Sequence, residues 1–182
     1  MSAIDDEPNS DSGSGAQRLA DLEGRLRRLE DIEAIKQLKA LYCKHCDDNY
    51  DADALASVFT EDAIWDGGGT FGRADGREGI RRHFSGASAR VTIARHQVMN
   101  PMIDVGIDGD NDRATGHWLL FQPCTDASPG GEQAVWLAAT YADEYRRVDG
   151  QWLISATMID VAFFTPFDAG WLDQRFLPGR EP

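Results

Sequence analysis

The sequence predicts an α+β protein whose helices come first along the chain and whose strands follow. Apolar residues spaced three and four apart from Leu19 to Leu41 indicate a long amphipathic helix. After Gly86 the chain turns to β-rich runs, and the dipeptides Asp108-Gly109 and Asp149-Gly150 between them are typical of tight hairpins. Helices followed by meandering strands favour α+β over alternating βαβ units.

The first helix is predicted to begin at Ala16 and to continue to Asp47. Its leucines from 19 to 29 extend beyond what a small core requires, so they either pack against another subunit or belong to a free amphipathic extension. Acidic and basic side chains balance between Leu19 and Asp47, and we expect them to form a solvated helix surface.

Shorter elements follow in order. A second helix is expected over Asp53–Phe59, with Asp51 or Asp53 as its N-cap, then a short strand over Ala63–Asp66 and a helix over Arg77–Ser85. Asn100-Pro101 is expected to form a turn. The predicted strands are Arg90–Val98, Met102–Ile107, Arg113–Phe121, Ala134–Val148 and Gln151–Phe163.

Length and charge limit the function classes. The chain has 182 residues and a formal net charge of −13, which disfavours nucleic acid and anionic membrane surfaces as partners. The acidic start resembles neither a secretory signal nor a transit peptide, so a cytoplasmic protein is expected. We divide the chain into a disordered acidic tail (1–16), one domain (17–170, with 17–30 as a helical extension) and a C-terminal tail (171–182).

Cofactor signals are weak. Cys43 and Cys46 form a C-x-x-C pair around His45, which could suggest a metal or redox site. The sequence has no second cysteine pair at zinc-finger spacing, and Cys43 and Cys46 lie in a helical pattern, so a structural role is favoured. The Gly67–Gly69 run lacks the helix and lysine of a phosphate loop, and no nucleotide cofactor or metal is expected.

The candidate chemistry lies in acids and histidines. Asp47, Asp48 and Asp51 cluster at the end of the first helix, and His96 ends an apolar strand. Histidine titrates near neutral pH, which makes His96 the best candidate for proton transfer. His45 and His83 are expected to be exposed, whereas His117 and Trp118 must face opposite sides of a strand. No serine or cysteine nucleophile motif is present, and a carboxylate–histidine pair suits lyase or isomerase chemistry.

Several segments carry a resemblance to a known family. They are Asp31-Ile-Glu-Ala-Ile-Lys-Gln-Leu-Lys-Ala-Leu-Tyr42, Leu55-Ala-Ser-Val-Phe-Thr-Glu-Asp-Ala-Ile-Trp65, Gly76-Arg-Glu-Gly-Ile80, His96-Gln-Val-Met-Asn100-Pro101, Ala114-Thr-Gly-His-Trp118 and Tyr145-Arg-Arg-Val-Asp-Gly-Gln-Trp152. Over residues 29–165 the chain resembles SnoaL-like members of the nuclear transport factor 2-like superfamily. It looks closest to bile acid 7α-dehydratases, is similar to hexachlorocyclohexane dehydrochlorinases through Phe164-Thr165-Pro166, and is more distantly similar to scytalone dehydratase.

The resemblance implies a fold and a site. The fold is a cone-shaped, strongly curved mixed sheet, a cystatin-like α+β barrel, that wraps a pocket closed by helices. By position, Asp47 would hydrogen-bond His96 as the general base, Tyr42 would share the pocket, and the protein would be a cofactor-free homotrimer. Gln122 replaces a further acid of the bile acid enzymes and Val161 replaces an arginine, so the substrate would be held differently.

These expectations combine into one functional hypothesis. The protein is predicted to be a cofactor-independent dehydratase that removes water from a hydrophobic hydroxylated ketone of the 7α-hydroxy-3-oxo-4-ene steroid type. The alternatives are a dehydrochlorinase or ketosteroid-type isomerase, and a non-catalytic ligand-binding module. The substrate-binding residues are expected to be Trp65, Trp118, Leu120, Gln122 and Phe163.

Overall fold

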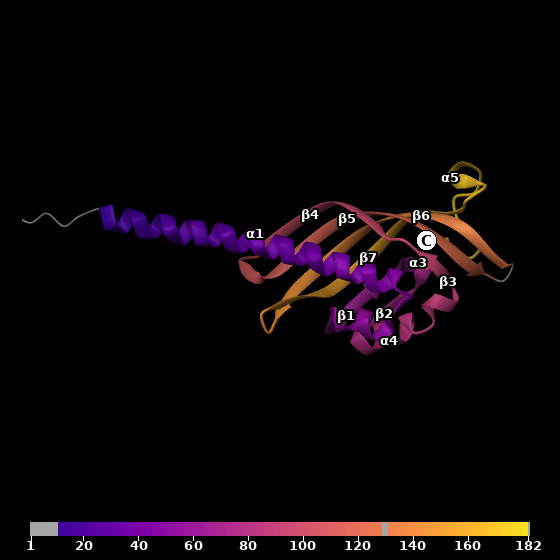
Figure 1. Ribbon diagram of the computed structural model, residues 1–182, viewed down its shortest axis with the longest axis horizontal. Coiled ribbons are helices and arrows are strands. Elements are labelled where there is room, and N and C mark those ends of the chain that lie inside the picture. Colours follow the sequence, from indigo (N-terminus) through magenta and orange to yellow (C-terminus); the bar gives the residue numbers. More distant parts are fainter. Residues whose placement is uncertain (1–10, 129–130, 182) are drawn as a thin grey trace, which may run out of the picture.

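The computed structural model describes residues 11–128 and 131–181, in which a curled, unclosed seven-stranded sheet packs against helices (Figure 1). The helices are α1 (Asp11–Asp47), α2 (Ala52–Ser57), α3 (Gly68–Phe71), α4 (Arg77–Phe84), the 3₁₀ helix η1 (Ala87–Ala89) and α5 (Gly170–Asp173). The strands are β1 (Phe59–Asp66), β2 (Arg73–Asp75), β3 (Val91–Ala94), β4 (Gln97–Ile107), β5 (Asp110–Ser128), β6 (Gly131–Val148) and β7 (Gln151–Pro166). The predicted α+β class with a curved mixed sheet is confirmed.

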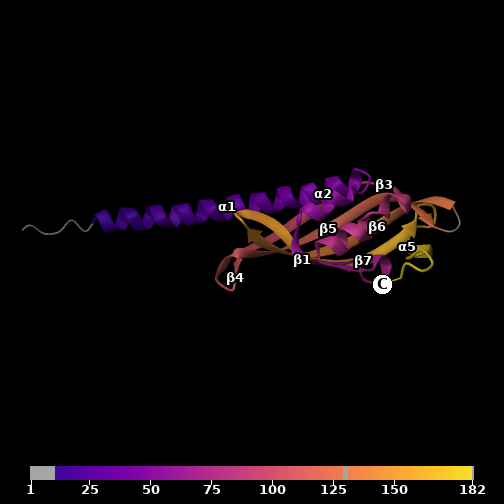
Figure 2. The same cartoon turned by 90° about the horizontal axis from the view of Figure 1, so that it is seen from below.

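The strand order places the three longest strands at the centre of the sheet. The order is β2-β1-β7-β6-β5-β3, and β4 also pairs with β5. The β1–β7 pair is parallel and every other pair is antiparallel. Figure 2 shows α1 lying along one face of this sheet, so that the C-terminal half of the helix covers the concave interior.

Both Asp-Gly hairpins form as predicted. Asp108 and Gly109 have φ of 54° and 80°, and Asp149 and Gly150 have φ of 50° and 79°. Two successive positive φ values are the signature of the type I′ turn that suits the twist of paired strands. These turns join β4 to β5 and β6 to β7 and fix the registers of both hairpins.

The prediction of a turn at Asn100-Pro101 is wrong. Strand β4 runs through this dipeptide, and its register with β5 shifts between Met99 and Met102. Asn100 has φ of 52°, and Pro101 lacks the N–H that a regular ladder needs, so the features that suggested a turn produce a bulge. The break lies earlier, between Ala94 and Gln97, and it separates β3 from β4.

The inner face of α1 is more polar than predicted. Ile35 and Tyr42 are buried in the core, as their spacing indicates. Asp31 and Lys39, expected on a solvated surface, are also buried. Asp31 accepts hydrogen bonds from Trp152 Nε1 at 3.0 Å and Arg147 Nη2 at 2.6 Å. These two donors replace the water molecules that would solvate the carboxylate at the surface.

Two boundaries differ from those expected. Helix α1 already begins at Asp11, and residues 1–10 of the expected tail lie outside the described residues. Asp51 caps α2 by accepting from the backbone N–H groups of Asp53 and Ala54, but Phe59, expected to end this helix, begins β1. The division of the chain into tail, domain and tail stays a prediction.

The C-terminal segment 174–181 returns to the body of the protein. Phe164 of β7 donates its backbone N–H to the Arg175 carbonyl at 3.0 Å and accepts from the Leu177 N–H at 2.8 Å. Leu177 is buried. Among residues 11–128 and 131–181, no helix is both long and apolar enough to span a membrane.

Candidate active site

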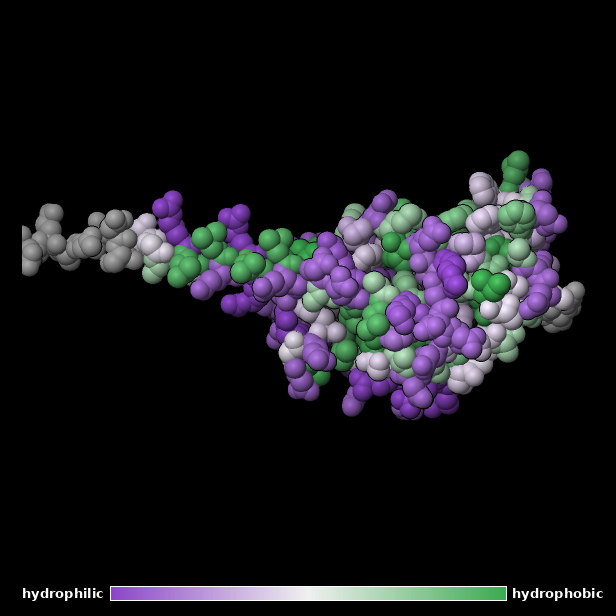
Figure 3. Space-filling model, viewed as in Figure 1, coloured by the Kyte–Doolittle hydropathy of each residue, from purple (hydrophilic) through white to green (hydrophobic). Residues whose placement is uncertain are grey.

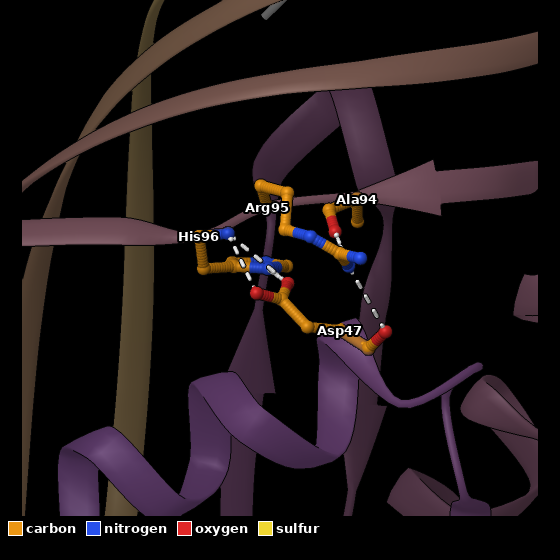
Figure 4. A network of polar contacts seen from close by, with 4 residues as sticks. All are labelled: Asp47, Ala94, Arg95 and His96. Atoms are coloured by element: carbon orange, nitrogen blue, oxygen red, sulfur yellow. Dashed lines mark hydrogen bonds and ion pairs between the residues drawn. The ribbon is translucent and has the colours of Figure 1, made fainter.

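Asp47 and His96 meet where the end of α1 faces the break between β3 and β4 (Figure 4). One carboxylate oxygen of Asp47 lies 2.6 Å from His96 Nδ1, and both oxygens accept from the His96 backbone N–H, at 3.0 and 3.1 Å. A carboxylate only accepts hydrogen bonds, so Nδ1 carries the hydrogen and the lone pair of the neutral ring resides on Nε2. The pair expected from the sequence is therefore in contact.

Arg95 adds a second link at this junction. Its Nη1 donates to the Ala94 carbonyl at 2.7 Å and makes a longer contact with the Asp47 carbonyl at 3.5 Å. The His96 side chain is 6% exposed and that of Asp47 is 23% exposed. The imidazole is thus shielded from water, while the carboxylate reaches the surface.

His96 lines an interior cavity of about 80 Å³ between the sheet and the helices. Its walls are mainly apolar, and Leu120, Leu137, Ile159 and Phe164 come from the sheet. Apolar walls lower the local dielectric and so strengthen the polar contacts inside the cavity. The polar groups that face the cavity besides His96 are Tyr42, Tyr50, His83, Arg90, Gln122, Asp126 and Arg180.

Tyr42 lies on α1, about one and a half helical turns before Asp47. Its hydroxyl oxygen accepts a hydrogen bond from Trp65 Nε1 at 3.1 Å, and both residues line the cavity. Burial raises the pKa of the Tyr42 hydroxyl well above its usual value. The group therefore keeps its proton and can donate a hydrogen bond to a ligand oxygen.

The expected substrate-binding residues divide into two groups. Trp65, Leu120 and Gln122 line the cavity. Trp118 and Phe163 do not line it, although Trp118 lines a neighbouring groove together with Asp47 and His96, and substrate binding by both residues stays a prediction. Trp118 donates from Nε1 to the Tyr145 hydroxyl at 3.0 Å beneath α1, because its place nearer the start of β5 carries it past the cavity. Phe163 stacks instead on Trp171, with ring centroids 4.9 Å apart.

The neighbours His117 and Trp118 on β5 face opposite sides, and Trp118 is buried while His117 is exposed. His83 was expected to be exposed, and this expectation is wrong. Its ring packs on Trp65 with centroids 4.6 Å apart, and it lines the cavity. Burial lowers the pKa of His83, and the nearby Arg90 guanidinium lowers it further.

Sequence reasoning missed Tyr50 and Arg180. Tyr50 has φ of 53°, stacks on Phe84 and hydrogen-bonds the Gln122 side chain. A left-handed tyrosine leaves no sequence signal, because residues of this size rarely adopt that conformation. Arg180 belongs to the segment expected to be a tail, yet its Nη2 lies 3.0 Å from Asp126 Oδ1 at the cavity wall.

The two cysteines of the C-x-x-C sequence lie in the hydrophobic core. Cys43 and Cys46 are buried and free, and burial raises the pKa of the Cys43 thiol to about 12. Across residues 11–128 and 131–181, no three His, Cys, Asp or Glu side chains are grouped so as to hold a metal ion.

Comparison with known proteins identifies relatives of this arrangement. The sequence profile of the SnoaL-like domain matches residues 27–157. The hexachlorocyclohexane dehydrochlorinase LinA-type3 from Novosphingobium barchaimii LL02 is 28% identical, with a TM-score of 0.68 over 80% of this chain and 95% of its own.

Two more distant structures share the fold. A candidate scytalone dehydratase from Novosphingobium aromaticivorans is 23% identical, with a TM-score of 0.66 over 77% of this chain and 89% of its own. A Nostoc punctiforme protein of unknown function with a cystatin-like fold is 23% identical, with a TM-score of 0.57 over 72% and 90%.

Proposed function

We propose that this chain, which belongs to the SnoaL-like domain family, is a cofactor-independent hydro-lyase acting on a hydrophobic hydroxylated ketone. One observation carries the proposal: the Asp47–His96 pair, joined at 2.6 Å, lines a mostly apolar cavity. The 28% identical dehydrochlorinase supports it, because dehydrochlorination is also an elimination.

The proposed reaction begins with proton transfer to His96. Nε2 takes a proton from the carbon next to the hydroxyl-bearing carbon, and the C–H electron pair delocalises onto the conjugated ketone oxygen. Asp47 stabilises the imidazolium that forms. The electron pair then expels the hydroxyl group, which takes the proton from Nε2 and leaves as water. General acid–base assistance of this kind contributes ~10²–10⁴-fold to the rate.

Tyr42 is assigned the role of donating a hydrogen bond to the ketone oxygen of the substrate. Its hydroxyl oxygen accepts from Trp65 and its O–H contacts the Cys46 sulfur, a weak acceptor that the O–H can leave for the substrate oxygen that gains negative charge. The raised pKa of Tyr42 keeps this donor protonated. Gln122, held by Tyr50, offers a neutral polar contact for a second oxygen of the substrate.

A steroid-sized substrate requires the cavity to widen. The cavity of about 80 Å³ is smaller than the ~300–1,000 Å³ of typical ligand pockets. The wall formed by Arg180 belongs to the C-terminal segment, whose polar contacts with Thr70 and Asp126 would have to break to admit a larger ring system. The 7α-hydroxy-3-oxo-4-ene steroid remains the proposed substrate type.

The first test measures elimination directly. The purified protein, without added cofactor, is incubated with a 7α-hydroxy-3-oxo-4-ene steroid, and the absorbance of the extended dienone is followed. We expect His96→Gln and Asp47→Asn to lower kcat/KM at least ~10²-fold, since each removes part of the general base. The control His117→Gln removes an exposed histidine on β5 and should leave the rate unchanged.

Other outcomes separate the alternatives. Chloride release from hexachlorocyclohexane without dienone formation would favour a dehydrochlorinase, which the similarity to LinA-type3 makes the second candidate. Saturable steroid binding with no turnover would favour a non-catalytic binding module. Equal rates for the wild type and His96→Gln would refute the Asp–His mechanism.

A further inference from the structure

The N-terminal part of α1 projects away from the rest of the protein (Figures 1 and 2). Every residue from 14 to 30 is exposed, and Asp31, which follows them, is buried. The helix meets the body at Arg28, whose Nη1 donates to the Val105 carbonyl at 2.6 Å. Residues 14–27 thus form a free helix, and none of them lines the cavity around His96.

An apolar seam runs along this free helix. Leu19, Leu22, Leu26 and Leu29 are 56–64% exposed, although leucine is usually buried. Figure 3 shows hydrophobic side chains gathered along one side of the projecting helix, with hydrophilic ones beside them. The spacing of three, four and three residues is that of the a and d positions of a heptad, the pattern by which helices pair with one another.

The charges that flank the seam are self-complementary. With Leu19 at position a, Arg18 and Arg25 occupy g positions, and Glu23 and Glu30 occupy e positions. In a parallel, in-register pair, each g residue faces the e residue five positions further along the other helix. Arg18 then faces Glu23 of the partner subunit, and Arg25 faces Glu30 of the partner subunit. An antiparallel pair would set arginine against arginine and glutamate against glutamate.

The seam is bounded at its C-terminal end. The next a and d positions after Leu29 are Glu33 and Lys36, and the apolar stripe shifts there to Ile35, which enters the core. A membrane-binding helix would concentrate basic residues on its polar face. Here the residues around the seam include both acids and arginines, which favours a helix of the same sequence as the partner.

We infer that the seam, Leu19–Leu29 with its flanking charges, is the self-association surface of this protein and joins copies of the chain as a parallel, in-register helical bundle. The sequence-based expectation of a homotrimer is one stoichiometry compatible with this bundle. The inference is independent of the proposed chemistry, because its residues and those around His96 are different.

The charge test compares two matched substitutions. Arg25→Glu places like charges together at the g and e positions, whereas Arg27→Glu makes the same charge change at an exposed b position outside the seam. Analytical ultracentrifugation of the full chain should show at least about a tenfold higher dissociation constant for Arg25→Glu and little change for Arg27→Glu. Combining Arg25→Glu with Glu30→Arg should restore association.

A crosslinking test fixes the orientation. Leu22→Cys places a thiol at a d position, where it meets the same residue of the partner only in a parallel, in-register bundle. Mild oxidation should join two full-length chains, and the buried native cysteines should not compete. A monomeric wild type at micromolar concentration, equal effects of Arg25→Glu and Arg27→Glu, or the absence of a crosslink in the Leu22→Cys variant would each overturn the inference.

Discussion

Asp47 occupies a position that a helix normally disfavours for an acid. It is the last residue of α1, where the macrodipole and the unpaired carbonyls repel negative charge. Two donors of His96, the backbone N–H and Nδ1, offset this cost. Asp47 thus holds His96 at two atoms, the backbone nitrogen and Nδ1. Substitution of Asp47 should therefore change the position of the imidazole ring as well as the charge beside it.

His83 should make stability depend on pH. Its pKa is lowered from 6.5 by burial, so between its folded pKa and 6.5 the unfolded chain binds more protons than the folded one. The free energy of unfolding should therefore rise with pH through this window and fall as the solution is acidified below 6.5. Urea denaturation across this range should give a shallower pH dependence for His83→Gln than for the wild type.

An exposed histidine provides the control for this experiment. His117→Gln also removes one histidine but takes away no ring contact with Trp65. Parallel pH dependences for His83→Gln and the wild type would contradict the role assigned to burial.

The sequence supports prediction of the Asp47–His96 contact better than prediction of the cavity around it. The positions of Asp47, His96 and Tyr42 follow from the resemblance to SnoaL-like proteins, which implies that an acid on the first helix meets a histidine of the sheet. Trp118 and Phe163 show the limit, because alternation identifies the face of a strand but not the distance along it at which the cavity ends. Arg180 depends on where a terminal segment packs, which no local pattern encodes.

At the scale of elements, α1 is tied to the sheet by a buried ion pair. Lys39 Nζ lies 2.8 Å from Asp143 Oδ2 on β6, and both side chains are almost fully buried. The ammonium also lies 3.4 Å from the centroid of the Tyr141 ring, and the Tyr145 hydroxyl donates to the same Asp143 oxygen. Hydrophobic periodicity describes the apolar members of this interface and gives no sign of its charged centre.

Removal of one member of this pair should strongly destabilise the fold. Lys39→Met leaves the Asp143 carboxylate buried without its cation, which typically costs about 3–5 kcal/mol. Lys44→Met on the same helix breaks the exposed pair with Asp48, which should cost no more than about 1 kcal/mol. Chemical denaturation of both variants measures the difference, and equal losses would show that the buried pair contributes no more than a surface pair.

At the scale of the whole molecule, the C-terminal segment completes the cavity. Thr70 and Arg180 exchange two hydrogen bonds between α3 and this segment, and the Arg180 guanidinium also pairs with Asp126. The end of the chain, more than 100 residues from α3 in sequence, thereby closes a wall that the sheet leaves open.

Cys124 can report on this closure. It lines the cavity, and burial raises the pKa of its thiol to about 12, so it should be inert toward thiol reagents in the native protein. Truncation after Gln174 should make Cys124 reactive, while Cys43, a buried residue of α1 that does not line the cavity, stays protected. Mass spectrometry of labelled peptides identifies the residue, and simultaneous labelling of all three cysteines would indicate unfolding instead.

The continuous helix α1 carries both the exposed leucines at its N-terminal end and Asp47 at its C-terminal end. Its last residue is Asp47, and its exposed leucines begin 28 positions earlier, with no break in the helix between them. An insertion of seven residues before Arg28 would lengthen the rod by about 10.5 Å and nearly preserve the rotational phase of the leucines relative to the body. An insertion of two would turn them to another side. In the proposed bundle, insertions of whole heptads would therefore change the spacing between copies and leave Asp47 in place at the other end of the helix.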